Sequence, residues 1–183
     1  IVLLSDPFEN TSYAPWKRAL AKVDKEELFH LRHGEVWMKR LCEASQAARQ
    51  EVQRAVDWMF QMGVEWFGMP DHLKTHTAQL EYRLKGKTND QLRQEWLSAV
   101  VPLSEGCGIA LPAHFDEKEE KYVLDYEFPV DYDAQRKRWR FDKPISWEQV
   151  FDRWKRRGPY NETYVNMVQK HYRAFVGLMN GGH

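Results

Sequence analysis

The sequence is poor in cysteine. It has two cysteines in 183 residues, Cys42 and Cys107, and they lie far apart along the chain. Two cysteines are too few for the disulfide framework of a small secreted domain, and their spacing does not match a structural zinc site. We therefore expect a protein of a reducing compartment and predict a cytoplasmic location.

Long apolar runs and an excess of either charge are also missing. No run approaches the roughly 20 apolar residues that cross a bilayer, and the opening IVLLSDP lacks the basic flank and cleavage site of a signal peptide. Lys plus Arg equals Asp plus Glu at 27 each, so no global field attracts nucleic acid or an anionic membrane. We predict a soluble protein with neither kind of partner.

Apolar and aromatic residues are plentiful. Hydrophobic residues make up 43% of the chain, which includes eight Trp, eight Tyr and nine Phe. This composition is that of a folded chain with large aromatic packing surfaces. The first residue is Ile, and the apolar IVLL stands directly before SDP, so we interpret the N-terminus as a truncated helix.

Helices of a bundle are predicted in the first part of the chain. Pro15 is suited to the first turn of a helix that continues to about Cys42. A second helical pattern spans roughly residues 45–66, and we expect these two helices to pack as an antiparallel pair. A third helix begins at the capping-box pattern of Thr88 and Gln91.

The character of the sequence changes after Pro112. The stretches YVLDYEF and KRWRF alternate as strands do, and a polar stretch between them predicts a turn and a small β-hairpin. Ser146 is expected to cap a short helix that ends at Gly158, and Asn161 to open the last helix.

Glu27 and His30 are the predicted functional residues of the first helix. Its expected inward stripe has spacings of three and four residues: Trp16, Leu20, Val23, Glu27, His30, Gly34, Trp37 and Leu41. A buried, ionised carboxylate without a partner costs several kcal/mol, so this pair requires a compensating charge. Residues i and i+3 share one helix face, where a carboxylate oxygen and an imidazole nitrogen can bind one metal ion. The stripe therefore predicts two metal ligands.

A structural alternative stays open. A Glu-x-x-His tetrapeptide arises readily by chance in a chain of this composition. Glu27 and His30 can instead pair with each other, or with an arginine, inside a purely structural bundle. The neighbours Glu26 and His33 are candidates for contacting the metal ligands. Glu26 lies one residue off the stripe and can equally be a solvated charge paired with Lys22, and His33 can equally be a surface residue.

The segment NTSYAPWKRALAKVDKEELFHLRHG resembles the third-to-fourth helix region of the phenylacetyl-CoA epoxidase catalytic subunits. WFGMPD, KTNDQLRQEWLSAVVPLSEGCGIALP and RRGPYNE resemble further landmarks of that family, in the same order, over about residues 10–176. The resemblance implies a mainly α fold. Residues 1–105 are then the second half of a ferritin-like helical bundle, and residues 106–183 are a C-terminal extension with a small hairpin and two helices.

The same resemblance implies a multicomponent monooxygenase that epoxidises the aromatic ring of phenylacetyl-CoA with dioxygen, in aerobic phenylacetate degradation. Glu27 and His30 match the second Glu-x-x-His of the family and become ligands of a non-haem di-iron centre. Electrons come from a separate NADPH-dependent flavin and iron-sulfur reductase, and a related metal-free ferritin-like subunit helps to bind coenzyme A. The other half of the ligands has no counterpart here, so the fragment alone is expected to be inactive.

Two departures keep other functions open. HLRHG replaces a glutamine-bearing version of the family motif, and residues 117–140 are longer and more charged than the family's connection. The chain can therefore be a non-catalytic scaffold or interaction subunit of the ferritin-like type. It can also support the same chemistry on another aromatic acyl-CoA, and no substrate-binding residue is assigned.

Overall fold

The chain folds into two compact units, Ile1–Pro144 and Ile145–His183. A computed structural model describes residues 1–74, 78–155 and 164–173. The first unit holds most of the helices and all the strands found in the described residues. The predicted mainly α architecture with a small β-hairpin is confirmed. None of the described helices combines the length and the apolarity required to cross a membrane.

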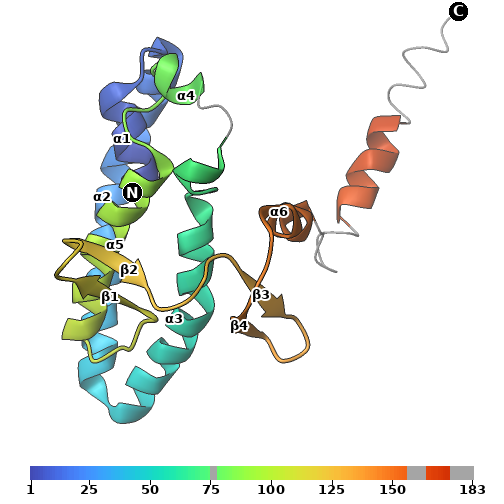
Figure 1. The fold of residues 1–183 in the computed structure, drawn as a ribbon. Helices are drawn as coiled ribbons and strands as arrows, with labels where there is room; N and C mark the ends of the chain where they lie inside the picture. Colours follow the sequence, from blue (N-terminus) through green and yellow to red (C-terminus); the bar gives the residue numbers. More distant parts are fainter. Residues whose placement is uncertain (75–77, 156–163, 174–183) are drawn as a thin grey trace, which may run out of the picture. The chain divides into compact units, whose positions relative to one another are not determined.

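Four helices form the framework of the first unit (Figure 1): α1 (Val2–Asn10), α2 (Ala14–Ala44), α3 (Gln46–Trp66) and α5 (Asn89–Gly106). Helix α2 runs the length of the unit, α3 returns, and α5 runs in the direction of α2. The predicted antiparallel pair of the first two long helices is thus confirmed as α2 and α3. Two short elements, η1 (Asp71–Leu73) and α4 (Ala78–Glu81), lie in the connection from α3 to α5.

Local sequence signals set the helix ends. Pro15 lies in the first turn of α2, where no amide hydrogen bond is lost. Ser45 is the single residue between α2 and α3, and its hydroxyl accepts a hydrogen bond from the Ala48 amide at 3.1 Å. Thr88 and Gln91 form the predicted capping box at the start of α5. These three signals locate the start of α2, the junction between α2 and α3, and the start of α5.

The core of the first unit lies between α3 and α5. Its buried residues are Phe60, Val64, Leu97, Val101 and Ala113. The ring of Trp96 packs over this cluster, with its centroid 5.5 Å from that of Phe60 and 5.8 Å from that of Phe67. A Cβ atom on Gly63 would come within 2.8 Å of the Trp96 ring, so glycine is required for this close approach.

The strands form two separate antiparallel hairpins: β1 (Ala113–Asp116) with β2 (Lys121–Leu124), and β3 (Val130–Asp133) with β4 (Arg138–Pro144). The predicted strands YVL and RWRF belong to β2 and β4, but the expectation that they pair with each other is wrong. Each turn is closed locally, because the carboxylates of Asp116 and Asp133 each accept two backbone N–H groups of the following residues.

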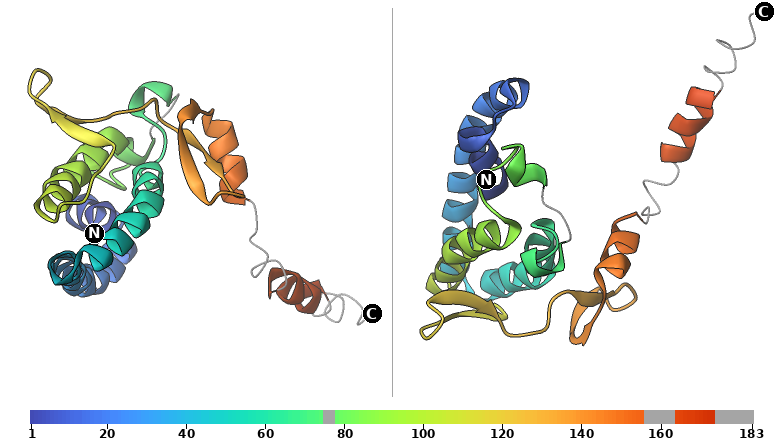
Figure 2. Two further views of the ribbon diagram at one scale, coloured as in Figure 1. Left: turned by 90° about the horizontal axis from the view of Figure 1, so that it is seen from below. Right: turned by 45° about the horizontal axis from the view of Figure 1, so that its top comes forward.

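Both hairpins are fastened to bundle helices. The Gln94 side chain of α5 donates to the Tyr122 carbonyl at 2.6 Å and accepts from the Tyr122 amide at 3.0 Å. The indole N–H of Trp139 in β4 donates to the Trp58 carbonyl of α3 at 2.7 Å. Figure 2 shows the β1–β2 hairpin beside α5 from two directions. The hairpins therefore cover the α3–α5 side of the bundle.

The second unit contains α6 (Trp147–Lys155) and a further helical stretch over residues 164–173. The predicted start of α6 is confirmed, because Ser146 and Gln149 exchange hydrogen bonds between side chain and backbone at 2.9 and 3.3 Å. The predicted helix end at Gly158 and the helix start at Asn161 lie outside the described residues.

Candidate metal-binding site on helix α2

The middle of α2 brings Glu27 and His30 together. Their i, i+3 spacing places both side chains on one helix face, with Glu27 Oε1 3.3 Å from His30 Nδ1. The Glu27 side chain is 32% exposed and that of His30 is 71% exposed. The pair therefore lies on the surface of the described chain.

The prediction that the whole stripe is buried is wrong within the described residues. Leu20 is buried and Val23 is half-buried, whereas Trp16, Trp37 and Leu41 each expose more than 40% of their surface. The physical reason is that α1 packs along α2 at one end and α3 at the other, and no described element covers this stripe. Periodicity identified an apolar face, but the described residues do not supply its partner.

This exposure changes the electrostatic argument for a metal. A carboxylate that retains contact with water does not require a buried countercharge. The contact between Glu27 and His30 also satisfies the structural alternative, in which the two side chains pair with each other. What supports a metal role is therefore the geometry of the donors rather than the cost of their burial.

The two donors fit one metal ion. Nitrogen and oxygen ligands that bind an ion at about 2.1 Å, roughly at right angles, lie about 3 Å apart. The observed 3.3 Å between Oε1 and Nδ1 is compatible with that arrangement. In the part of the chain that the structure describes, no three His, Cys, Asp or Glu side chains gather to hold an ion. Glu27 and His30 thus provide part of a ligand set.

The neighbouring candidates have other observed contacts. The Glu26 carboxylate is largely exposed and lies 4.0 Å from the ammonium of Lys22, as the solvated alternative requires. His33 is exposed, and its ring lies 6.1 Å from the Trp37 ring. A contact of either residue with the metal ligands remains a prediction.

Comparison with known proteins gives this helix a context. The sequence profile of a family described as phenylacetic acid catabolic protein matches residues 1–147. The chain belongs to the phenylacetic acid catabolic protein family. It is also 35% identical, over 116 residues, to a subunit of 1,2-phenylacetyl-CoA epoxidase from Escherichia coli (strain K12). The resemblance predicted from the sequence motifs is confirmed.

The extent of these matches matters for function. The aligned residues make up 61% of this chain but only 38% of the E. coli relative, so the chain spans well under two thirds of that protein. The phenylacetic acid catabolic protein profile includes the helices α1 to α5, both hairpins and the Glu27–His30 pair. It ends at Trp147, at the start of α6.

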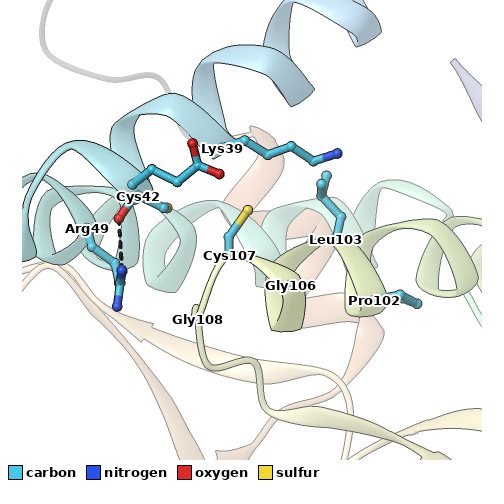
Figure 3. A pocket seen from close by; sticks show the side chains of 9 residues that line it. Lys39, Cys42, Arg49, Pro102, Leu103, Gly106, Cys107 and Gly108 are labelled. Carbon is cyan, nitrogen blue, oxygen red and sulfur yellow. Dashed lines mark hydrogen bonds between the residues drawn. The ribbon is translucent and has the colours of Figure 1, made fainter.

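A pocket in the same family region was not predicted. It has a volume of about 630 Å³ and lies where the C-terminal ends of α2 and α5 meet (Figure 3). Its lining includes Lys39, Cys42, Glu43, Arg49 and Cys107. The sequence contains a signal for this pocket. When three successive helices are antiparallel, the first and the third run parallel. Cys42 and Cys107, at the C-terminal ends of the first and third helices, then lie at the same end of the bundle.

Proposed function

We propose that this chain is part of the oxygenase component of a multicomponent di-iron monooxygenase that epoxidises the ring of phenylacetyl-CoA in phenylacetate degradation. Membership of the phenylacetic acid catabolic protein family and the identity to an epoxidase subunit support the reaction class. The observation that carries the proposal is the convergence of Glu27 Oε1 and His30 Nδ1 on the exposed apolar face of α2.

In this function Glu27 and His30 hold one iron of a non-haem di-iron centre. The bound centre supplies dioxygen reduction and transfer of one oxygen atom to the ring. Glu27 would contribute negative charge that offsets the charge of the metal, and His30 would bind through a ring nitrogen. The remaining ligands would come from other helices of the assembled bundle.

The apolar residues further along the stripe have a role in assembly. Trp16, Trp37 and Leu41 lie roughly two to three helical turns from the nearer of Glu27 and His30 and are half-exposed. Further bundle helices that pack on these side chains would cover the whole stripe, and a lower local dielectric would then strengthen the interactions of charged groups. The exposed face therefore supports assembly into a larger bundle.

The proposed enzyme requires partners. Electrons come from a separate NADPH-dependent flavin and iron-sulfur reductase, and a related metal-free ferritin-like subunit supports the catalytic one. The substrates are dioxygen and a coenzyme A thioester, and the complex works in the cytoplasm. Assays with a panel of aromatic thioesters decide between phenylacetyl-CoA and another aromatic acyl-CoA.

Metal analysis tests the proposal. In the full-length protein purified with its partner subunits, we expect Glu27→Ala and His30→Ala to lose most of the bound iron. Glu51→Ala is the matched control, because it removes an exposed carboxylate of α3 that pairs with Arg54. Iron content that is the same in all three variants and the parent protein would contradict the assignment.

A second candidate is a scaffold subunit without metal. It is favoured by the direct Glu27–His30 contact, which pairs the two groups without an ion. This function predicts that the parent protein binds no iron in its complex and that Glu27→Gln lowers the stability of the metal-free protein. The oxygenase proposal instead predicts that the parent protein binds iron in its complex.

A further inference from the structure

Cys42 and Cys107 are neighbours in the folded chain. Both are free and buried, and together with Ile109 they form one cluster. Cys42 belongs to the last turn of α2, and Cys107 caps the C-terminal end of α5. Met38, Val52, Val56 and Leu103 pack around this cluster.

The backbone holds both cysteines in place. Arg49 donates two hydrogen bonds from its guanidinium to the Cys42 carbonyl, at 3.1 and 3.0 Å. The Cys107 amide donates to the carbonyls of Leu103 and Ser104 at 3.2 and 3.0 Å. The backbone at both cysteines is therefore fixed by hydrogen bonds at the ends of their helices.

A small reagent has access to the pair. Both cysteines line the pocket of about 630 Å³, between Lys39 and Glu43 of α2, Arg49 of α3 and the last turn of α5 (Figure 3). The two residues differ in exposure, with Cys107 at 8% and Cys42 at 2%. Cys107 is thus the more exposed residue of the two.

We propose that Cys42 and Cys107 are a reversible modification site, where hydrogen peroxide converts the two thiols to a disulfide that links the C-terminal ends of α2 and α5. This site is separate from Glu27 and His30 and does not depend on the proposed oxygenase function. A disulfide requires the two Cβ atoms to lie about 3.8 Å apart, and the two side chains already belong to one packed cluster.

The reaction balances with peroxide as the oxidant. The Cys107 thiolate attacks one peroxide oxygen and becomes a sulfenic acid, and the other oxygen leaves as water. The Cys42 thiol then attacks the sulfur of the sulfenic acid, forms the S–S bond and releases a second water. Burial, followed by the neighbouring Cys107, raises the pKa of Cys42, which suits Cys42 to the second step rather than the first.

Thiol counting in the folded protein tests this. The folded chain is treated with hydrogen peroxide, quenched and then unfolded for labelling. We expect both thiols to become unreactive to maleimide together, and mass spectrometry without reductant to show a Cys42–Cys107 cross-linked peptide. Dithiothreitol should restore both thiols. The oxidised chain should also melt at a higher temperature, because the cross-link restricts the unfolded state.

Single variants test the order of events. In Cys42→Ser we expect a sulfenic acid at Cys107 that dimedone traps, and in Cys107→Ser we expect Cys42 to react much more slowly. Circular dichroism verifies that each variant is folded. The proposal is overturned if the folded parent chain loses its thiols independently, forms only intermolecular links, or yields the cross-link only after denaturation.

Discussion

Helices α2 and α5 carry similar apolar stripes but differ in what covers them. Helix α5 buries Leu97 and Val101 against α3 and lies beneath the β1–β2 hairpin. Helix α2 is the longer helix, yet only Leu20 and Cys42 are buried along it. An apolar stripe shows that a helix face requires a partner, whereas the covering element must be found elsewhere.

The comparison also separates two kinds of stability. The α3–α5 side is stabilised within the described chain, by side chains that are almost fully removed from water. The α2 stripe contributes to stability only when another element covers it. Substitutions on the two sides should therefore have different effects in the isolated chain.

The largest expected effect is a matched pair of leucine truncations. Leu97→Ala removes a side chain that is 1% exposed and should lower the free energy of unfolding by about 2–5 kcal/mol. Leu41→Ala on the α2 stripe removes one that is 42% exposed and should lower it by about 1 kcal/mol or less. Urea unfolding of the isolated chain measures both. Equal losses would show that α2 is covered in solution.

Two Gly→Ala substitutions should have smaller effects than the leucine pair. One should destabilise the chain and the other should stabilise it. Gly63→Ala places a Cβ atom 2.8 Å from the Trp96 ring and should destabilise the chain by about 1–3 kcal/mol. No atom lies within 4 Å of the Cβ position at Gly34 on α2, so Gly34→Ala should stabilise the isolated chain by about 0.5–1 kcal/mol. Thermal unfolding tests the pair, and destabilisation by Gly34→Ala would indicate a close neighbour on the stripe.

The smallest expected effect concerns the turn that holds the β1–β2 hairpin over α5. Hydrogen bonds from the Lys118 and Glu119 amides lower the pKa of Asp116. Because this pKa is lowered on folding, the stabilisation is present above the ordinary aspartate value of about 3.9 and is lost as the pH falls through the folded-state pKa. The Lys118 amide resonance should report a midpoint below that ordinary value, and Asp116→Asn should remove the transition. A midpoint at or above it would contradict the turn.

Much of the fold followed from local signals. The capping box of Thr88 and Gln91 and the proline in the first turn of α2 act on their own helix ends, so the sequence alone locates them. The pairing of the strands was not predicted correctly. Asp116 and Asp133 each close a tight turn, so β2 pairs with β1 and β4 pairs with β3. A pattern of alternation identifies a strand but not its neighbour.

For the candidate site, too, the local contact could be predicted from the sequence, whereas its burial could not. The contact of Glu27 with His30 is a property of i, i+3 geometry on one helix. Burial of that contact depends on elements far away in space, which periodicity does not reveal. Cys42 and Cys107 are neighbours because α2 and α5 run parallel. Their proximity could therefore be recognised only once the topology of the bundle was known.

The single-residue connection at Ser45 has a consequence for how this chain can vary in length. An α-helix turns by about 100° per residue. An extra residue in a connection this short would rotate α3 about its axis and turn Phe60 and Val64 away from α5, unless the junction absorbed the change. A substitution at Ser45 alters a helix cap, whereas an insertion there changes which face of α3 points into the core. Natural variation in length should therefore concentrate in the hairpin turns instead.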